Sequence, residues 1–271
     1  MTEDEPGIIA AAGTDGILRI TIDRAEVGNS LSPLARDALT TAVQEAHASP
    51  NVRAVLLTAA GSRHFCAGAG LGSHTGQQDP PTERRPGDIA KMLQQGWQRL
   101  ISAVLDCDKP VVAAVQGVAA GAGASLVLAC DLVVMSSEAR LVAPFVDRGI
   151  LPDSGAIHLL TRIVGLRRAT EILMLGEPID AAACERLGLA NRVVAPEATQ
   201  AAAEEIALRL AQGPTVMLAL TKRLLSVSSE SGRDRAFEQE AWAQEVVAGT
   251  ADMAEGLREF AERRPPNFQG F

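Results

Sequence analysis

Three observations in the sequence predict an α/β fold followed by a helical C-terminal region. Short apolar runs alternate with helical patterns through the first two thirds of the chain, as in stacked strand–helix–strand units. Two of these strand patterns lead through turns rich in glycine and alanine into a helix. Beyond residue 195 the helical period continues without another strand pattern. We therefore expect an α/β core over residues 1–195 and a helical region over 196–271.

The first elements follow from residue period and from turn chemistry. Residues 8–10 and 17–22 flank a turn at 13–16 with glycine at both ends, which predicts a hairpin. A serine–proline pair opens the next helix, over residues 32–48. Serine is a good helix cap and proline is tolerated at the first helical position.

Strands and helices alternate in the middle of the chain. The strand patterns there are nearly all apolar, which is typical of buried parallel strands. We expect strands over residues 52–58, 110–115 and 132–135. Helices are expected between them, over 89–105 and 122–129. Residues 72–88 carry glycine, proline, glutamine and charges without a period, so we expect a loop there, close to a functional site.

Composition excludes several classes of protein. Of the 271 residues, 47% are hydrophobic and 21% are charged, which is ordinary for a globular protein and excludes general disorder. No apolar run is long enough to span a membrane, and the acidic first residues do not resemble a secretory signal, so we expect a cytoplasmic protein. The formal charge of −8 argues against nucleic acid or an anionic membrane as the main partner.

Cysteine and histidine usage does not predict a metal site. The four cysteines, Cys66, Cys107, Cys130 and Cys184, include no pair separated by two residues. The four histidines are isolated from one another as well. We expect reduced cysteines that pack in the core, and no metal.

The two glycine-rich turns are the strongest candidates for a ligand site. They run over residues 61–71 and 116–126, each between a buried strand and a helix start. The first N–H groups of a helix lack intrahelical partners and favour negative charge, and small residues let a ligand approach them. Two such turns that converge would hold an oxyanion. Each turn alone also fits tight helix–strand packing, and a dinucleotide site is a further alternative, although neither turn reads GxGxxG and no P-loop lysine follows.

Seven segments of the sequence are similar to the crotonase superfamily, also called the enoyl-CoA hydratase/isomerase family. They include Asp23-Arg24-Ala25, the turn Cys66-Ala67-Gly68-Ala69-Gly70, and Leu151-Pro152-Asp153-Ser154-Gly155. In full, the matching segments span 23–32, 65–71, 117–131, 149–155, 162–165, 188–190 and 254–265. The resemblance therefore extends over nearly the whole chain.

The resemblance implies a fold of repeated ββα units whose C-terminal helical region helps to assemble a homotrimer, or a hexamer made of two trimers. It also implies an acyl-CoA thioester substrate, with coenzyme A as part of the substrate and no separate cofactor. Two backbone N–H groups polarise the thioester carbonyl in this family, and by position they fall on Ala69 and Ala122. Many members have aspartate after the first alanine, where this chain has Gly70.

The resemblance further implies contacts with coenzyme A. The adenine would lie near the backbone of the first turn, a basic residue would reach a phosphate, and the tail would reach coenzyme A bound to a neighbouring subunit. The matching residues are Cys66, Ala67 and Gly68 for the adenine, Arg24 for the phosphate, and Phe260 and Arg264 for the neighbouring subunit.

The proton-transfer group is predicted to be Asp153. Hydratases of the family hold water with two glutamates, and the matching positions here are Ser125 and Phe145. Neither side chain replaces a carboxylate, so efficient hydration is not expected. Asp153 matches members in which an aspartate moves a proton between carbons of the acyl chain, which predicts an enoyl-CoA isomerase. A helix cap is the alternative role for Asp153.

Three other functions stay open on sequence grounds. One is an enoyl-CoA hydratase of low efficiency. Another is a hydrolase similar to the aryl-CoA dehalogenases, in which the aspartate is a nucleophile, although Phe145 lacks the ring N–H that those enzymes place there. The third is a non-catalytic subunit that binds acyl-CoA.

Overall fold

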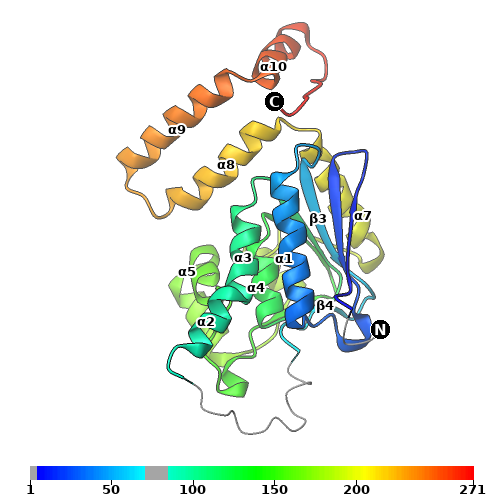
Figure 1. Cartoon of the computed structure of the whole chain (residues 1–271), viewed down its shortest axis with the longest axis vertical. Coiled ribbons are helices and arrows are strands. Elements are labelled where there is room, and N and C mark those ends of the chain that lie inside the picture. The colour runs from blue at the N-terminus through cyan, green and yellow to red at the C-terminus, as the bar shows by residue number, and fades with distance from the viewer. Residues whose placement is uncertain (1–4, 71–84) are drawn as a thin grey trace.

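Six strands form the larger of two sheets in the computed structural model, which describes residues 5–70 and 85–271 (Figure 1). In spatial order they are β1 (Ile8–Ala12), β2 (Ile17–Ile22), β3 (Ala54–Ala59), β5 (Val111–Val115), β7 (Leu132–Ser136) and β10 (Arg192–Val194). β1 and β2 are antiparallel, which confirms the expected hairpin, whereas all other neighbours are parallel. Most of the loop expected over 72–88 lies outside the described residues.

Four shorter strands form the second sheet within the described ranges. In spatial order they are β4 (His64–Cys66), β6 (Val118–Ala120), β8 (Arg140–Val142) and β9 (Ile179–Asp180). Along the chain, β3, β5 and β7 of the large sheet are each followed by one strand of the small sheet and then by helix. This order confirms the predicted repeat of ββα units.

Local sequence explains where the core helices begin and end. They are α1 (Pro33–Ala48), α2 (Asp88–Gln95), α3 (Trp97–Asp106), α4 (Ala122–Ala129), α5 (Ala156–Leu175) and α6 (Ala181–Arg186), with 3-10 turns η1 (Ala25–Val27), η3 (Val146–Arg148) and η4 (Pro196–Ala198). Ser32 caps α1, because its hydroxyl accepts the Ala35 N–H at 3.2 Å. The single helix expected over 89–105 is two helices. Gly96 separates them with φ −103° and ψ −107°, outside the helical region.

Helices cover both faces of the large sheet. α1 and α3 pack on one face, and α7 (Thr199–Ala211) packs on the other (Figure 1). Ala203, Ala207 and Ala211 recur once per turn of α7 and contact Leu56 and Val112 of the sheet. Small side chains let the helix lie close to the strands. α7 follows the boundary expected at residue 196, yet it packs as part of the core.

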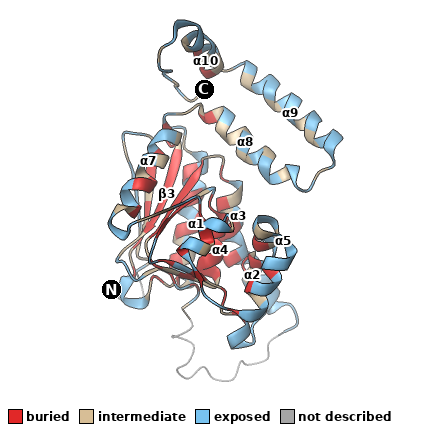
Figure 2. Ribbon diagram, turned by 180° about the vertical axis from the view of Figure 1, so that it is seen from behind, coloured by how far each residue is buried: buried red, intermediate tan, exposed pale blue. Residues whose placement is uncertain are grey.

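The last three helices project away from the sheets (Figure 1, Figure 2). They are α8 (Thr215–Ser228), α9 (Arg233–Ala248) and α10 (Ala251–Glu262). α8 is tied to the core by Lys222, whose ammonium donates to the Val104 carbonyl at 3.0 Å and lies 2.7 Å from the Asp131 carboxylate. Among the helices of the described residues, none has the length and apolar character needed to cross a bilayer.

Candidate active site

The two glycine-rich turns lie against each other. β4 pairs with β6 in parallel register, so the turns that follow these strands start side by side. Gly68 has a left-handed φ of 83°, and a Cβ there would stand 2.8 Å from the Ala120 carbonyl oxygen and 3.2 Å from the Ala122 nitrogen. A Cβ at Gly123 would overlap the carbonyl oxygen of Cys66. Glycine at both positions is therefore what allows the two turns to touch.

Two backbone N–H groups at this contact have no partner among residues 5–70 and 85–271. They belong to Ala69 and Ala122. The neighbouring groups are used: the Gly68 carbonyl accepts the Leu31 N–H at 2.9 Å, and the Gly121 N–H donates to the Val142 carbonyl at 2.9 Å. Ala122 is the first residue of α4, where N–H groups are free and the helix dipole is positive. A pair of this kind can stabilise negative charge on an oxygen.

Further along α4, Ser125 carries a buried hydroxyl. Ser125 is 1% exposed, and its Oγ has no hydrogen-bond partner in the part of the chain that the structure describes. Phe145, after β8, is buried as well. Neither position can hold and deprotonate a water as a carboxylate does.

Asp153 does not cap a helix. The helix that follows it, α5, has Gly155 at its N-cap and no side chain bonded there. The Ala156 N–H donates to the main-chain carbonyl of Asp153 at 2.9 Å, while the Asp153 carboxylate accepts the Ser154 hydroxyl at 2.9 Å. Ser154 holds a left-handed φ of 52°, an unfavourable value for a residue with a side chain. The helix-cap interpretation is therefore wrong, and the other oxygen of the carboxylate is available.

Asp153 opens into a groove of about 630 Å³ between α3, α5 and the turn after α8. Gln98, His158, Arg162 and Glu230 line the same groove. Ala69 and Ala122 are not part of its lining, although α5 packs against α4, the helix that begins with Ala122. The structure thus brings the two alanines together and places Asp153 in a groove on the adjoining helix.

The first turn also contains the residues expected near the adenine. Cys66 and Gly68 are buried and Ala67 between them is exposed. Complete burial raises the pKa of the Cys66 thiol to about 12, so this cysteine is a neutral packing group at pH 7. Only the backbone and the Ala67 methyl group present a surface here.

Arg24 has a structural position that its charge did not predict. Its side chain is buried, with Nε donating to the Ser30 carbonyl at 3.0 Å and Nη1 to the Glu5 carbonyl at 2.9 Å. These bonds hold the segment that leads from β2 into α1. A contact with a phosphate of coenzyme A stays a prediction.

The helix α10, which carries Phe260 and precedes Arg264, lies away from β4 and α4 of its own chain (Figure 1). Phe260 is 82% exposed on α10. Arg264 follows α10 and pairs with Glu255 and Glu262, at 2.6 Å each. Within one chain they do not join the site, which is compatible with the predicted contact to a neighbouring subunit.

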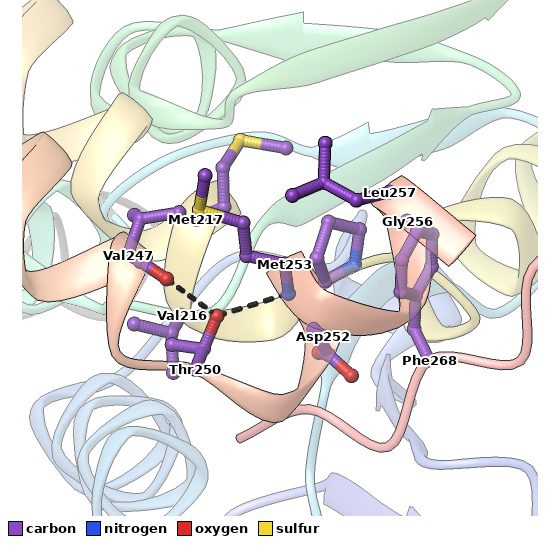
Figure 3. Close-up of a pocket in the computed structure, with 10 residues that line it drawn as sticks. Val216, Met217, Val247, Thr250, Asp252, Met253, Gly256, Leu257 and Phe268 are labelled. Carbon is purple, nitrogen blue, oxygen red and sulfur yellow. Dashed lines mark hydrogen bonds between the residues drawn. The ribbon is translucent and has the colours of Figure 1, made fainter. Parts of the chain in front are cut away.

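A smaller cavity of about 250 Å³ lies among α8, α9, α10 and the C-terminal tail (Figure 3). Met217, Met253, Leu257 and Phe268 make its wall mainly apolar. The Thr250 hydroxyl in this wall is already bonded to the Val247 carbonyl and to the Met253 N–H. Asp252 also lines the cavity, and its carboxylate accepts the Gln269 N–H at 2.6 Å and the Gly270 N–H at 2.8 Å.

Sequence reasoning missed most residues of the groove beside Asp153. His158 and Arg162 are four residues apart, a spacing that places them on one face of a helix and could have suggested a shared site. Glu230 comes from a serine-rich turn separated from Arg162 by 68 positions. No local pattern connects residues that are so far apart.

Comparison with known proteins agrees with this architecture. The family model described as enoyl-CoA hydratase/isomerase matches residues 12–270. The 1,2-epoxyphenylacetyl-CoA isomerase of Escherichia coli is 32% identical over 255 residues, which cover 94% of this chain and 95% of the relative. A Rhodobacter capsulatus relative named "Probable enoyl-CoA hydratase" is 34% identical over 257 residues, covering 95% and 96%.

A solved structure extends the similarity to three dimensions. An enoyl-CoA hydratase from Bacillus anthracis matches with a TM-score of 0.90 at 29% identity, over 98% of this chain and 100% of that one. The relatives carry both hydratase and isomerase names. The chain belongs to the enoyl-CoA hydratase/isomerase family, whose crotonase fold it shares.

Proposed function

We propose that the protein is an enoyl-CoA isomerase that moves the double bond of an acyl-CoA thioester with Asp153. The observation that supports this proposal is which of the three candidate positions for proton transfer carries a carboxylate. The two positions that hold glutamate in hydratases are Ser125 and Phe145, whereas Asp153 keeps a carboxylate that caps no helix. One positioned carboxylate is enough for a proton shift between carbons, but hydration also requires a group to hold and deprotonate water.

The Ala69 and Ala122 N–H groups form the oxyanion hole in this proposal. When a proton leaves the carbon next to the thioester, negative charge moves to the thioester oxygen. Two fixed N–H donors stabilise that enolate without reorganising during the reaction, and one such donor lowers the barrier by about 2.7–4 kcal/mol. Neither N–H group has another partner within residues 5–70 and 85–271, which supports this role.

Asp153 carries the proton from one carbon to another. With a 3-enoyl-CoA, the carboxylate takes a proton from C2, and the electron pair of that bond enters the enolate. The carboxylic acid then returns the proton to C4, the double bond settles between C2 and C3, and the thioester carbonyl re-forms. No water and no separate cofactor is consumed.

Coenzyme A would lie across the first turn and reach a second subunit. In this proposal the adenine contacts the backbone of Cys66, Ala67 and Gly68, and Arg24 contacts a phosphate of coenzyme A. Phe260 and Arg264 would contact coenzyme A on the neighbouring subunit of a homotrimer, or of a hexamer of two trimers. The position of α10 away from its own core supports an intersubunit role.

Asp153→Asn tests the proton shift. The substitution keeps the shape and removes the base, so we expect isomerisation of hex-3-enoyl-CoA to fall at least ~100-fold. Affinity for a saturated acyl-CoA should stay nearly unchanged. The rise in conjugated-thioester absorbance measures the rate, and proton exchange at C2 or C4 in deuterium oxide measures the transfer itself. Retention of full activity by the variant would disprove the role of Asp153.

A hydratase is the second candidate, because relatives with that name match most of the chain. Incubation with crotonyl-CoA decides between the two functions, since hydration removes the conjugated absorbance. We expect slow loss at most. Rapid hydration that survives Asp153→Asn would favour the hydratase, and acyl-CoA binding without turnover of any thioester would favour a non-catalytic subunit.

A further inference from the structure

The turn between α8 and α9 forms one wall of the groove beside Asp153, and Arg162 attaches this turn to α5. Arg162 of α5 donates to the Ser226 carbonyl at 3.0 Å and to the Ser229 hydroxyl. It also pairs with the Glu230 carboxylate at 3.3 Å. These three bonds hold the turn between α8 and α9 opposite Asp153. The groove is therefore an open depression of the surface whose wall from the C-terminal region is fixed to α5.

The charged groups of the groove leave one carboxylate without a cation. Arg162 is neutralised by Glu230, and the imidazole Nε2 of His158 lies 4.0 Å from the same carboxylate. Asp153 adds a carboxylate that has no cation in contact and accepts only the Ser154 hydroxyl among the described residues. An anionic ligand would meet Asp153 and Glu230 with no unpaired cation to attract it.

Uncharged hydrogen-bonding groups in the groove are unused. The Gln98 amide and the Thr161 hydroxyl line it and make no hydrogen bond to another residue of 5–70 or 85–271. Gln98 projects from α3 and Thr161 from α5, so the two approach the cavity from different helices. An alkyl chain that displaced water from these groups would leave them without partners, which is unfavourable.

We propose that this groove holds the far end of the acyl group and selects acyl chains with an uncharged oxygen there, a hydroxyl or a carbonyl, over plain alkyl chains. Asp153 stands at the point where the groove meets the turn before α5. The acyl chain passes Asp153 and extends between α3 and α5, where Gln98 and Thr161 bond its oxygen. The proposal rests on the proposed function, because it takes Asp153 as the residue next to the reacting carbons.

Binding of unreactive thioesters tests the groove. Saturated ω-hydroxyacyl-CoAs of four to eight acyl carbons are compared by calorimetry with the plain acyl-CoAs of the same length, using the full chain. We expect the hydroxyl to tighten binding about 5–10-fold at the best length, the value of one or two hydrogen bonds. In a Gln98→Leu, Thr161→Val double variant the ratio should fall to about one.

Thr170→Val is the matched control. Thr170 is exposed on the same helix, outside the groove, and its hydroxyl bonds the Leu166 carbonyl. This variant should keep the full preference for the hydroxylated thioester. Equal binding of the two thioesters at every length, or a preference that survives in the double variant, would overturn the proposal.

Failure of the groove and failure of the isomerase are separable. Saturated thioesters undergo no isomerisation, so the binding ratio does not depend on turnover. If the protein prefers the hydroxylated thioester but has no isomerase activity, the proposal about the groove stands and the proposed function is wrong. If it is an active isomerase without this preference, the role of Asp153 stands and the proposal about the groove is wrong.

Discussion

The α/β core and the three last helices differ in how they bury their apolar residues. In the core, the middle strands β3, β5 and β7 are buried almost from end to end, between α1 and α3 on one face and α7 on the other. In contrast, α9 has no buried residue, and α8 has one, Thr215 (Figure 2). Large apolar side chains such as Phe237 and Trp242 stand in solvent there.

This difference means that the two regions are stabilised by different interactions. The core is stabilised by contacts within the chain, because its middle strands are covered on both faces. The last helices depend on local helix formation, on a few ties to the core, and on any surface that a second subunit supplies. Isolated helices of 12–16 residues are marginal in water. We therefore expect substitutions in the two regions to have different effects.

The same truncation in both regions gives the largest expected contrast. Leu57→Ala in β3 removes a side chain that is 1% exposed, and Leu225→Ala in α8 removes one that is 68% exposed. The first should lower the free energy of unfolding by about 2–5 kcal/mol, the second by less than about 0.5 kcal/mol. Urea titration at low protein concentration measures both. A large loss in Leu225→Ala would mean that α8 is buried against another chain.

Removal of the tie between α8 and the core should have an intermediate effect. Lys222 is largely buried, and burial raises the pKa of the Asp131 carboxyl against the opposing effect of this lysine. Lys222→Met removes the cation beside that carboxylate and the ammonium that donates to the Val104 carbonyl, so we expect a loss of about 1–3 kcal/mol. Adding Asp131→Asn should restore part of it, because the Val111 N–H keeps an acceptor. Additive losses in the double variant would show that the two groups do not interact.

Local chemistry explains why much of the core could be predicted. The hairpin, the Ser32 cap and the alternation of strands with helices depend on residues that are neighbours in sequence. The contact between the two turns also has a local signal, since Gly68 and Gly123 are needed where the backbones approach. Such features can be predicted from a few neighbouring residues.

Features that depend on distant residues could not be predicted in the same way. The resemblance places Arg24 near a phosphate, a contact that stays a prediction, and does not indicate that its guanidinium bonds two main-chain carbonyls brought near by folding. The Gly96 break depends on what packs around α2 and α3, and Glu230 reaches the groove only through Arg162. α7 has the same helical period as α8, so the period alone does not distinguish them. α7 belongs to the core because it covers the face of the large sheet that α1 and α3 leave open.

The smallest expected effect concerns the C-terminal tail and its dependence on pH. Glu255 accepts Arg264 and the Asn267 N–H, and the Arg264 guanidinium above all lowers the pKa of the Glu255 carboxyl to about 2. A carboxyl whose pKa is lower in the folded state stabilises that state above its unfolded pKa, and the contribution disappears as the pH falls through the folded value. The bonds from Glu255 to the tail should therefore hold at neutral pH and weaken between about pH 4.5 and pH 2. Hydrogen exchange at the Asn267 amide should accelerate over that range relative to a core amide such as Val112, once intrinsic exchange is corrected for. Glu255→Gln, which retains an acceptor oxygen but not the charge, should remove the dependence, whereas an unchanged pH profile in this variant would locate the titrating group elsewhere.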